Sequence, residues 1–431
     1  MIKQKVTFFW FRRDLRLDDN VGLFYALQSD FPVIPLFIFD EDILENLSKN
    51  DARVNFIYDS LQKVNNQLVV NNSSILIKKG KVIEVWKSLL EDYDIQKVFY
   101  NKDYEPFAIK RDLSINLLLS ESNIECISHK DHVIFEEKEI TKTNGTPYTI
   151  YTPYKNKWLE KYLSSGTILE HKTLSLFANF NKILFPFPKL SEIGFEKSSI
   201  KVQPYNLTQI ANYKETRDFP DLDTTSYLSP HLRFGTVSIR KLVNWANRTN
   251  QTFLNELIWR EFFIQVLFNF PNSVNHNFKS AYDGIQWRNN EEDFKHWCSG
   301  TTGYPIVDAG MRQLNETGYM HNRVRMIVAS FLCKHLLINW QWGEAYFAEK
   351  LLDYELASNV GNWQWVAGTG CDAAPYFRVF NPEIQQKKFD KKGLYIRKWI
   401  LEFDFNYNEP MIDHSFARDR AIATYKTGIL K

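Results

Sequence analysis

The stretch Thr7-Phe8-Phe9-Trp10-Phe11-Arg12-Arg13-Asp14 decides the fold, because a short run of β-favouring residues ends abruptly in three charged ones. A run of this composition is typical of a strand. It is too short for the apolar core of a signal peptide or for a membrane span. We therefore expect a cytoplasmic protein with neither an export signal nor a membrane anchor.

Strand-like and helix-like stretches alternate in the first part of the chain. The β-rich runs at residues 33–39, 75–77 and 97–100 are separated by helical patterns, for example at residues 20–28 and 54–69. Such alternation predicts βαβ units and a parallel sheet. The N-terminal domain is therefore expected to be α/β, with a doubly wound parallel sheet.

Two further segments follow this domain, which we place at residues 1–130. Residues 131–202 contain Thr143-Asn144-Gly145-Thr146-Pro147 and Phe185-Pro186-Phe187-Pro188 with little sustained periodicity, which predicts an interdomain connector. Residues 203–431 lose the strand pattern and are expected to form an all-helical domain. Its clearest apolar period, at three-to-four spacing, comprises Val324, Ile327, Val328, Phe331, Leu332 and Leu336.

Composition excludes several classes of function. With 53 basic and 51 acidic residues the net charge is +2, so any surface that binds nucleic acid must be local. The four cysteines, Cys126, Cys298, Cys333 and Cys371, are widely spaced, so neither a disulfide framework nor a zinc site is indicated.

Aromatic residues reach 15% of the chain, which fits a large ring-packed core or rings that stack on a base or a flat cofactor.

A hydroxyl-rich helix start is expected at Thr225-Ser226-Tyr227-Leu228-Ser229-Pro230. The pattern predicts Ser229 as the N-cap and Pro230 as the first helical residue. A helix end of this kind offers backbone N–H donors to an anion, and it is equally consistent with an ordinary cap.

Polar and aromatic side chains share one face of the helical pattern at residues 253–263. The spacing i, i+3, i+4 and i+7 places Glu256, Trp259, Arg260 and Phe263 together. A carboxylate, an indole and a guanidinium on one face suit a flat ligand that forms hydrogen bonds. A surface Glu–Arg pair beside a half-buried tryptophan explains the same pattern.

Two further clusters follow. A helix expected to begin near Met320 carries Asn322 and Met326 at i, i+4, where two neutral side chains either line a pocket or serve packing. The segment Asn359-Val360-Gly361-Asn362-Trp363-Gln364-Trp365 precedes Gly368-Thr369-Gly370. Two glycines are too few for a dinucleotide or Walker loop, which disfavours hydride transfer at a Rossmann site.

These motifs together resemble the cryptochrome/photolyase family. The N-terminal signature is Trp10-Phe11-Arg12-Arg13-Asp14-Leu15-Arg16-Leu17-Asp18-Asp19-Asn20, and the three helical clusters match the flavin-domain motifs in order. The similarity extends over residues 303–312 and 372–382 and so covers almost the whole chain. It implies a light-driven DNA repair enzyme, most similar to class I photolyases that act on cyclobutane pyrimidine dimers (CPDs).

The resemblance implies FAD in the helical domain. The residues that match its phosphate-binding positions are Tyr213, Thr225, Ser226, Tyr227, Leu228 and Ser229. Those that match the positions around the flavin are Phe253, Glu256, Arg260, Arg325, Asp353, Tyr354, Glu355 and Asn359. Arg325 is expected to pair with Asp353 near the ring, which an ordinary salt bridge would also explain.

Asn359 matches the position that faces flavin N5, where a neutral amide cannot act as a proton source. This implies a reduced flavin as the working state and favours repair over signalling. Trp363, Trp340 and Trp287 match the tryptophans that pass electrons to the photoexcited flavin. They lie far apart in the sequence, so only the fold can align them.

The resemblance also implies UV-damaged DNA as the partner, with the lesion flipped out of the duplex. The implied lesion and DNA contacts are Glu256, Trp259, Arg260, Phe263, Asn322, Arg323, Met326, Trp365 and Gln385. Among these, Glu256, Asn322 and Met326 are assigned with Asn359 to catalysis. His321 is expected to point about 100° away from Asn322 on a helix of 3.6 residues per turn. Neither a metal nor a membrane is implied, and a monomer is expected.

A second, light-harvesting chromophore is left open. Some folate-binding relatives use an Asn–Glu pair where this chain has Phe107 and Ala108. This difference disfavours folate, and a folate, a deazaflavin, another chromophore or none stays open. Three alternative functions also stay open: a cryptochrome photoreceptor, a (6-4) photolyase, and a non-catalytic DNA- or flavin-binding module.

Overall fold

Two compact units make up the chain, and neither is one continuous segment. The computed structural model describes residues 3–166, 168–405 and 407–429. The first unit comprises residues 1–139, 160–204 and 228–248, and the second comprises residues 140–159, 205–227 and 249–431. This grouping differs from the linear division expected at residues 130 and 202.

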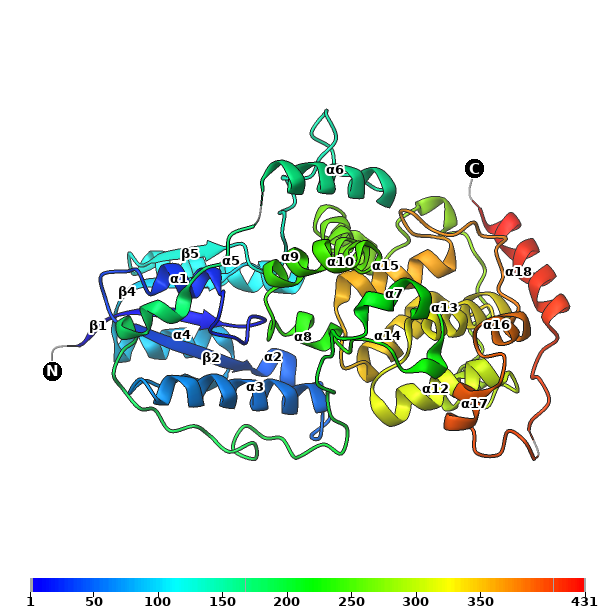
Figure 1. The fold of residues 1–431 in the computed structure, drawn as a ribbon, viewed down its shortest axis with the longest axis horizontal. Coiled ribbons are helices and arrows are strands. Elements are labelled where there is room, and N and C mark those ends of the chain that lie inside the picture. Colours follow the sequence, from blue (N-terminus) through cyan, green and yellow to red (C-terminus); the bar gives the residue numbers. More distant parts are fainter. Residues whose placement is uncertain (1–2, 167, 406, 430–431) are drawn as a thin grey trace. The chain divides into compact units, whose positions relative to one another are not determined.

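The first unit contains a five-stranded parallel sheet in the order β3-β2-β1-β4-β5 (Figure 1). The strands are β1 (Lys5–Phe11), β2 (Val33–Asp40), β3 (Leu76–Gly80), β4 (Asp94–Asn101) and β5 (Glu125–His129). The α/β prediction is confirmed, and the four expected strands are present. The sequence pattern missed β5, whose apolar content is only Cys126 and Ile127.

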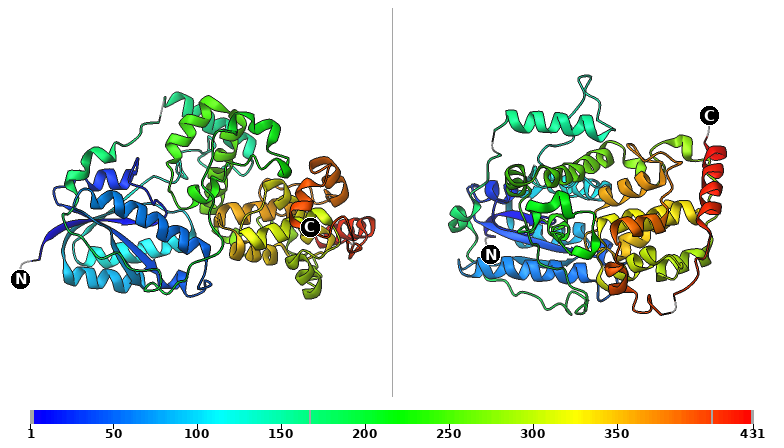
Figure 2. Two further views of the ribbon diagram at one scale, coloured as in Figure 1. Left: turned by 60° about the horizontal axis from the view of Figure 1, so that its bottom comes forward. Right: turned by 45° about the vertical axis from the view of Figure 1, so that its right-hand side comes forward.

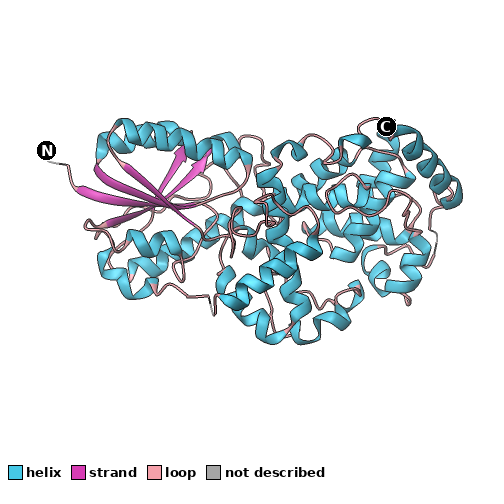
Figure 3. Ribbon diagram, turned by 90° about the horizontal axis from the view of Figure 1, so that it is seen from above, coloured by secondary structure: helices cyan, strands magenta, loops and turns pink. Residues whose placement is uncertain are grey.

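Helices cover both faces of this sheet, as Figure 3 shows. They are α1 (Val21–Ala26), α2 (Glu41–Leu44), α3 (Ala52–Val69), α4 (Val82–Asp92) and α5 (Pro106–Glu121). Alternate residues of β1 point to opposite faces. Trp10 meets Trp86 of α4 edge to face at 5.7 Å, while Phe9 shares a buried cluster with Leu61 of α3. A strand buried on both faces explains why β1 reads as a continuous apolar run.

A buried ion network joins the segment 228–248 to the residues that follow β1 and β5. Helix α9 (Ile239–Thr249) supplies Arg240, whose guanidinium is 3.0 Å from Asp19 and 2.8 Å from Asp131. Arg16 reaches Asp131 at 2.8 Å. All four side chains are at most 8% exposed. Because unpaired buried charges are costly, this network explains why residues 228–248 belong to the sheet-containing unit.

The segment 131–202 contains more regular structure than its sequence pattern predicted. Helix α6 (Tyr151–Ser164) and the 3₁₀ helix η1 (Thr173–Asn179) lie within it. The run Phe185-Pro186-Phe187-Pro188 is irregular, as its prolines dictate. Tyr154 and Trp158 of α6 are buried, and both donate hydrogen bonds to Glu261, at 3.4 Å and 2.7 Å.

The rest of the chain is mainly helical, as predicted, and all five strands precede residue 130 (Figure 2). The α-helices here are α7 (Tyr213–Thr216), α8 (Ser229–Arg233), α10 (Gln251–Asn269), α11 (Glu291–Ser299), α12 (Pro305–Thr317), α13 (Asn322–Ser330), α14 (Trp340–Lys350), α15 (Leu356–Ala367), α16 (Pro382–Phe389), α17 (Leu394–Trp399) and α18 (His414–Gly428). Short helices are η2 (Ile210–Asn212), η3 (Pro220–Leu222), η4 (Pro271–Val274), η5 (Ser280–Tyr282) and the π-helix η6 (Phe331–His335).

Two helix starts differ from the sequence predictions. Helix α8 begins at Ser229, so Ser229 is not its N-cap; Leu228 takes that position and makes no capping side-chain hydrogen bond. Leu228 already has helical dihedral angles, which moves the start one residue toward the N-terminus. Helix α13 begins at Asn322 rather than near Met320, because His321 caps it by accepting from the backbone N–H of Arg323 at 3.2 Å.

Within the described residues, no helix is both long and apolar enough to cross a membrane, and no group of three or more His, Cys, Asp or Glu side chains is placed to hold a metal ion.

The ion network yields a stability prediction. Replacing Arg240 by Met leaves Asp19 and Asp131 buried with fewer partners, which should lower the free energy of unfolding by about 3–5 kcal/mol. The matched control is Lys241→Met, because Lys241 pairs with Asp18 at 2.5 Å but both side chains are at least 40% exposed. That exposed pair should contribute less than about 1 kcal/mol. Urea denaturation measures both, and equal effects would contradict the prediction.

The same network makes stability depend on pH. Burial alone would raise the pKa of Asp19, but hydrogen bonds from His171 and the Arg240 guanidinium lower it to about 2. Because the folded pKa lies below the unfolded one, the contribution is complete above about pH 4 and is lost as the pH falls toward 2. The difference between the parent and Arg240→Met should therefore shrink in that acidic range.

Candidate active site on helices α10, α13 and α15

The short turn 353–355, just before α15, is held by two arginines from different helices. Arg325 of α13 forms a two-fold hydrogen bond with Asp353, at 3.2 Å and 2.9 Å, as expected from the sequence. Arg260 of α10 reaches Glu355 at 2.8 Å. The two carboxylates are only 7% and 6% exposed. Charge-assisted hydrogen bonds to buried carboxylates fix geometry strongly, so α10, α13 and α15 are positioned together.

Glu256 lies one helical turn before Arg260 on α10 and is half-buried. Its carboxylate pairs with Arg217 at 2.5 Å. Burial raises the pKa of Glu256 and the Arg217 guanidinium lowers it, and the net shift is upward from the ordinary value. Sequence reasoning missed Arg217, although its spacing of four residues from Tyr213 was a usable signal.

The N-terminal turn of α13 carries the next group of expected site residues. Asn322 is exposed, and the guanidinium of Arg323 lies 3.7 Å from the sulfur of Met326 and 2.6 Å from Asp218. His321 is buried at the cap, so the 100° helical rotation expected for it does not apply. Burial and the nearby Arg323 and Arg325 lower the pKa of His321 to about 4, which keeps the imidazole neutral near neutral pH.

Asn359 lies in the first half of α15 and is buried. Its amide donates to the backbone carbonyl of Glu344 at 3.1 Å and to the carboxyl oxygen of Glu344 at 2.9 Å. Burial raises the pKa of Glu344. Since the amide N–H₂ is engaged with α14, the carbonyl end of Asn359 is oriented away from Glu344.

The residues expected to bind phosphate are divided between the units. Tyr213 meets Phe253 of α10 edge to face at 5.3 Å, and Tyr227 contacts Tyr319 at 4.9 Å. Tyr319 in turn lies 5.8 Å from the guanidinium of Arg325, so Tyr227 is linked to the Arg325–Asp353 pair. Thr225 and Ser226 belong to this same unit, whereas Leu228 and Ser229 belong to the sheet-containing unit.

The indole of Trp259 is stacked on Tyr151 of α6, with ring centroids 3.5 Å apart and an angle of 8°. Tyr151 is fixed because its hydroxyl donates to the carbonyl of Asn255 at 2.8 Å. Sequence reasoning missed Tyr151, because the segment around it showed no sustained helical period. One face of the indole is therefore covered by protein.

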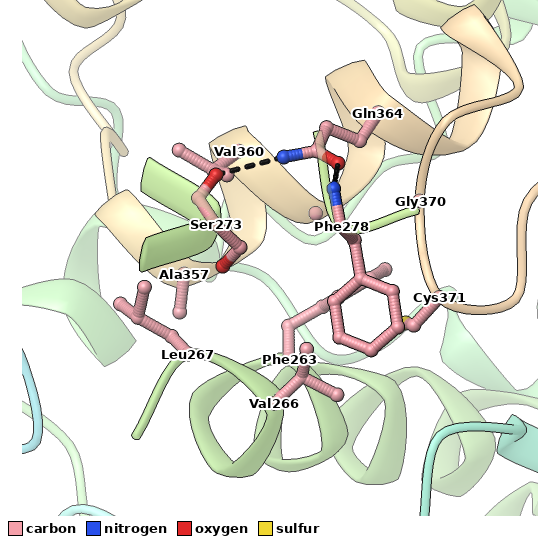
Figure 4. A pocket seen from close by; sticks show the side chains of 11 residues that line it. Phe263, Val266, Leu267, Ser273, Phe278, Ala357, Val360, Gln364, Gly370 and Cys371 are labelled. Atoms are coloured by element: carbon pink, nitrogen blue, oxygen red, sulfur yellow. Dashed lines mark hydrogen bonds between the residues drawn. The ribbon is translucent and has the colours of Figure 1, made fainter. Parts of the chain in front are cut away.

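Phe263, which the sequence assigned to the lesion contacts, is buried between α10 and α15. A Cβ added at Gly361 would lie 2.2 Å from its ring, so the two helices are in close contact there. Phe263 also lines a small apolar pocket with Val266 and Val360 (Figure 4). Gln364 closes one side of this pocket by donating to the carbonyl of Ser273 at 2.7 Å. With 6% exposure, Phe263 offers almost no surface to a ligand.

The three tryptophans that the resemblance assigned to electron transfer lie in one packed region. Trp363 and Trp340 are buried members of one cluster, and half-buried Trp287 packs against it. Trp363 approaches α14 so closely that a Cβ at Gly343 would lie 2.1 Å from its ring. Gly343 is three residues after Trp340 on α14, so the two residues lie on the same side of that helix.

Two expected DNA contacts are not joined to Glu256. Trp365 packs half-buried against the core of the helical unit, and Gln385 is partly exposed on α16. In the part of the chain that the structure describes, no side-chain hydrogen bond or ring contact links either of them to the Glu256–Arg217 pair.

Comparisons with known proteins cover both halves of the chain. Residues 7–173 match the family model described as DNA photolyase, and residues 253–405 match the FAD binding domain of DNA photolyase. A deoxyribodipyrimidine photo-lyase of Halobacterium salinarum is 34% identical, with 97% of this chain and 98% of that protein covered.

Two solved structures are similar over nearly the whole chain. A class III photolyase from Agrobacterium tumefaciens has a TM-score of 0.85 at 31% identity, covering 99% of this chain and 98% of that one. An archaeal photolyase from Sulfolobus tokodaii, solved with two FAD molecules, has a TM-score of 0.86 at 33% identity and covers 98% and 100%.

The contact between Gly343 and Trp363 predicts the direction in which Gly343→Ala changes the stability of the protein. On helix propensity alone, Gly343→Ala should stabilise the protein by about 1 kcal/mol. The clash with the Trp363 ring should reverse this and destabilise it by about 1–3 kcal/mol. In a Trp363→Leu background the clash is relieved, so the same substitution should be neutral or stabilising. Urea denaturation of the four proteins tests this, and stabilisation by Gly343→Ala alone would refute the close contact.

Proposed function

Because the chain belongs to the cryptochrome/photolyase family, we propose that it repairs DNA by splitting cyclobutane pyrimidine dimers in a light-driven reaction. The observation that carries the proposal is the face of α10, where Glu256 lies one turn before Arg260, the residue that binds Glu355 of the turn 353–355. Within this proposal the assignment to class I is a prediction, since one similar structure is that of a class III enzyme.

The chain has an FAD-binding domain, and the chemistry of its side chains fits FAD. Arg260 and Arg325 are fixed by carboxylates and the amide of Asn359 is held by Glu344, so these groups need no rearrangement to meet a polar ring. The hydroxyls of Thr225 and Ser226 suit a pyrophosphate. When bound, FAD in its reduced form supplies the light-driven electron that splits the dimer.

The site residues then have distinct tasks. Glu256 forms hydrogen bonds to the carbonyl edge of the pyrimidines and stabilises the charge that develops there. Asn322 and Met326 line the lesion side as neutral groups, Arg323 meets phosphate, and Trp259 supports the lesion with its remaining ring surface. Trp365 and Gln385 are further DNA contacts. Asn359 would face flavin N5 as a group without an ionisable proton.

A (6-4) photolyase needs a proton donor on the lesion side, usually a histidine. The chain has Asn322 and Met326 at the matching positions, and His321 is neutral because burial lowers its pKa to about 4. CPD splitting needs no such donor. These observations favour CPD repair over (6-4) repair, and the neutral Asn359 favours repair over a cryptochrome function.

The remaining assignments concern the partner and the cell. We propose UV-damaged DNA as the partner, a monomeric and cytoplasmic protein, and no metal requirement.

For the second chromophore, Phe107 is 50% exposed and Ala108 is buried on α5, so neither supplies the polar contacts of the folate-binding pair. A deazaflavin, another chromophore or none therefore stays open.

The lesion assignment is tested on oligonucleotides that carry one defined lesion each. Illumination with prereduced enzyme should restore the CPD substrate and leave the (6-4) substrate intact, as measured by chromatography. A matched dark reaction should restore neither. Restoration of the (6-4) substrate alone would overturn the proposal, and no light-dependent change in either would favour the photoreceptor alternative.

The tryptophan assignment predicts that light-driven reduction of FAD and DNA repair respond differently to a substitution in the path. Trp340→Phe should strongly slow light-driven reduction of oxidised FAD, because it removes the middle of the proposed path from Trp287 to Trp363. Repair by chemically prereduced enzyme should be unchanged, since the path only restores the flavin. Trp297→Phe is a matched control, because Trp297 is fully buried in the same cluster and lies outside the proposed path. Photoreduction as fast in Trp340→Phe as in the parent would show that the path is misassigned.

A further inference from the structure

Four charged side chains form two ion pairs at the proposed lesion-binding face, linked through adjacent residues of the chain, and we call this set the circuit. Arg217 and Asp218 are adjacent in the chain just after α7, and each pairs with a residue of a different helix. Arg217 reaches Glu256 of α10 at 2.5 Å, and Asp218 accepts from Arg323 of α13 at 2.6 Å. The proposed function assigns Glu256 to the lesion and Arg323 to phosphate, and both side chains are therefore already paired within the protein.

The carboxylates of this circuit are more exposed than those at the turn 353–355, which are 7% and 6% exposed. The side chains of Arg217 and Glu256 are 29% and 31% exposed, and those of Asp218 and Arg323 are 39% and 19% exposed. Partly exposed ion pairs exchange partners at low free-energy cost. A DNA phosphate forms charge-assisted, bidentate hydrogen bonds with arginine, as a carboxylate does. Bound DNA can therefore take Arg217 from Glu256 and Arg323 from Asp218.

Arg217 is the arginine that pairs with Glu256 within the described residues, so loss of Arg217 would remove this ion pair. The other groups that face Glu256 are the phenols of Tyr151 and Tyr213 and the carboxylate of Asp218. The phenols are neutral, because burial raises the pKa of both far above neutral pH. Burial and the charge of Asp218 both raise the pKa of Glu256, and Arg217 is the group that opposes them. A carboxylate in this position gains a proton when its cation leaves and a lesion excludes water.

We propose that Arg217 is a positioning residue that holds Glu256 ionised in the free protein and releases it when a phosphate of the lesion strand binds, so that Glu256 takes up one proton. This inference rests on the proposed function. The proton comes from solvent, remains on the carboxyl oxygen and lets Glu256 donate a hydrogen bond to a pyrimidine carbonyl. It returns to solvent when the repaired strand leaves, so the cycle consumes no proton.

The exchange gives the enzyme a means of selecting lesions. A carboxylate would repel the electron-rich carbonyl edge of a pyrimidine, whereas a carboxylic acid donates to it. Donation becomes available only when a phosphate and a base are both in place. Glu256 would therefore be switched on by the complete lesion-containing strand.

Proton uptake on binding is directly measurable. The FAD-loaded protein is titrated in the dark with a CPD-containing oligonucleotide, by calorimetry in two buffers of different ionisation enthalpy near pH 7. We expect uptake approaching one proton per complex, and an affinity that falls by up to about tenfold per pH unit as the pH rises. Glu256→Gln should abolish the uptake. No uptake by the parent, or uptake that persists in Glu256→Gln, would overturn the proposal.

Arg217→Met separates a positioning role from simple phosphate binding. Without the guanidinium, Glu256 should be protonated already in the free protein, so binding should take up no proton and the pH dependence of affinity should flatten. The matched control is Lys214→Met, which removes an exposed charge from the same short helix α7 and should leave proton uptake at the parental value. Parental uptake in Arg217→Met would refute the role of Arg217.

A third variant tests the other half of the circuit and covers the case in which Arg217→Met does not fold. Asp218→Asn frees Arg323 from a competing carboxylate, so affinity for damaged and undamaged DNA should rise several-fold at low salt. Unchanged or weaker binding would show that no partner is exchanged there. Light-dependent repair is measured on the same samples: repair without proton uptake refutes this inference alone, whereas absence of repair refutes the proposed function.

Discussion

The site depends on the cost of leaving a buried charge unpaired. Asp353 and Glu355 lie almost fully buried in one turn, and each is neutralised by an arginine from a different helix. Removing either partner would leave an uncompensated charge, so the turn can adopt only the position that satisfies both. Since α15 begins directly after this turn, its direction and rotation follow, and with them the places of Asn359 and Trp363.

Close packing of aromatic rings on glycines transmits this constraint through the helical unit. Gly361 admits the ring of Phe263 from α10, and Gly343 admits the ring of Trp363 from α15. At both contacts a side chain larger than hydrogen would collide with the ring, so backbone and ring are in direct contact. The high aromatic content of the chain is thus explained largely by core packing, and the three tryptophans of the proposed path belong to that packing.

The near-zero net charge has a consequence for DNA binding. Arg217 and Arg323, the arginines next to the proposed lesion-binding residues, each have a carboxylate partner in the structure. In the proposed exchange, a bound polyanion replaces these carboxylates as the partner of each arginine. The exchange would couple DNA binding at this place to the protonation of Glu256.

The sequence by itself determined the parallel sheet, the helical character of the later half, and the face of α10 that carries Glu256 and Arg260. These properties depend on the spacing of residues within one element, which the chain order states directly. Family resemblance added the Arg325–Asp353 pair, whose geometry the structure confirms.

Only the tertiary structure decided which distant residues meet. Arg217 lies 39 positions from Glu256, and Tyr151 stacks on Trp259 from a segment that showed no helical period. Residues 228–248 join the sheet-containing unit through Arg240, and His321 caps α13 where a position on the helix surface was expected. Periodicity reports the face on which a residue lies but carries no information about the partner, because that partner is set by the folding of other segments against it.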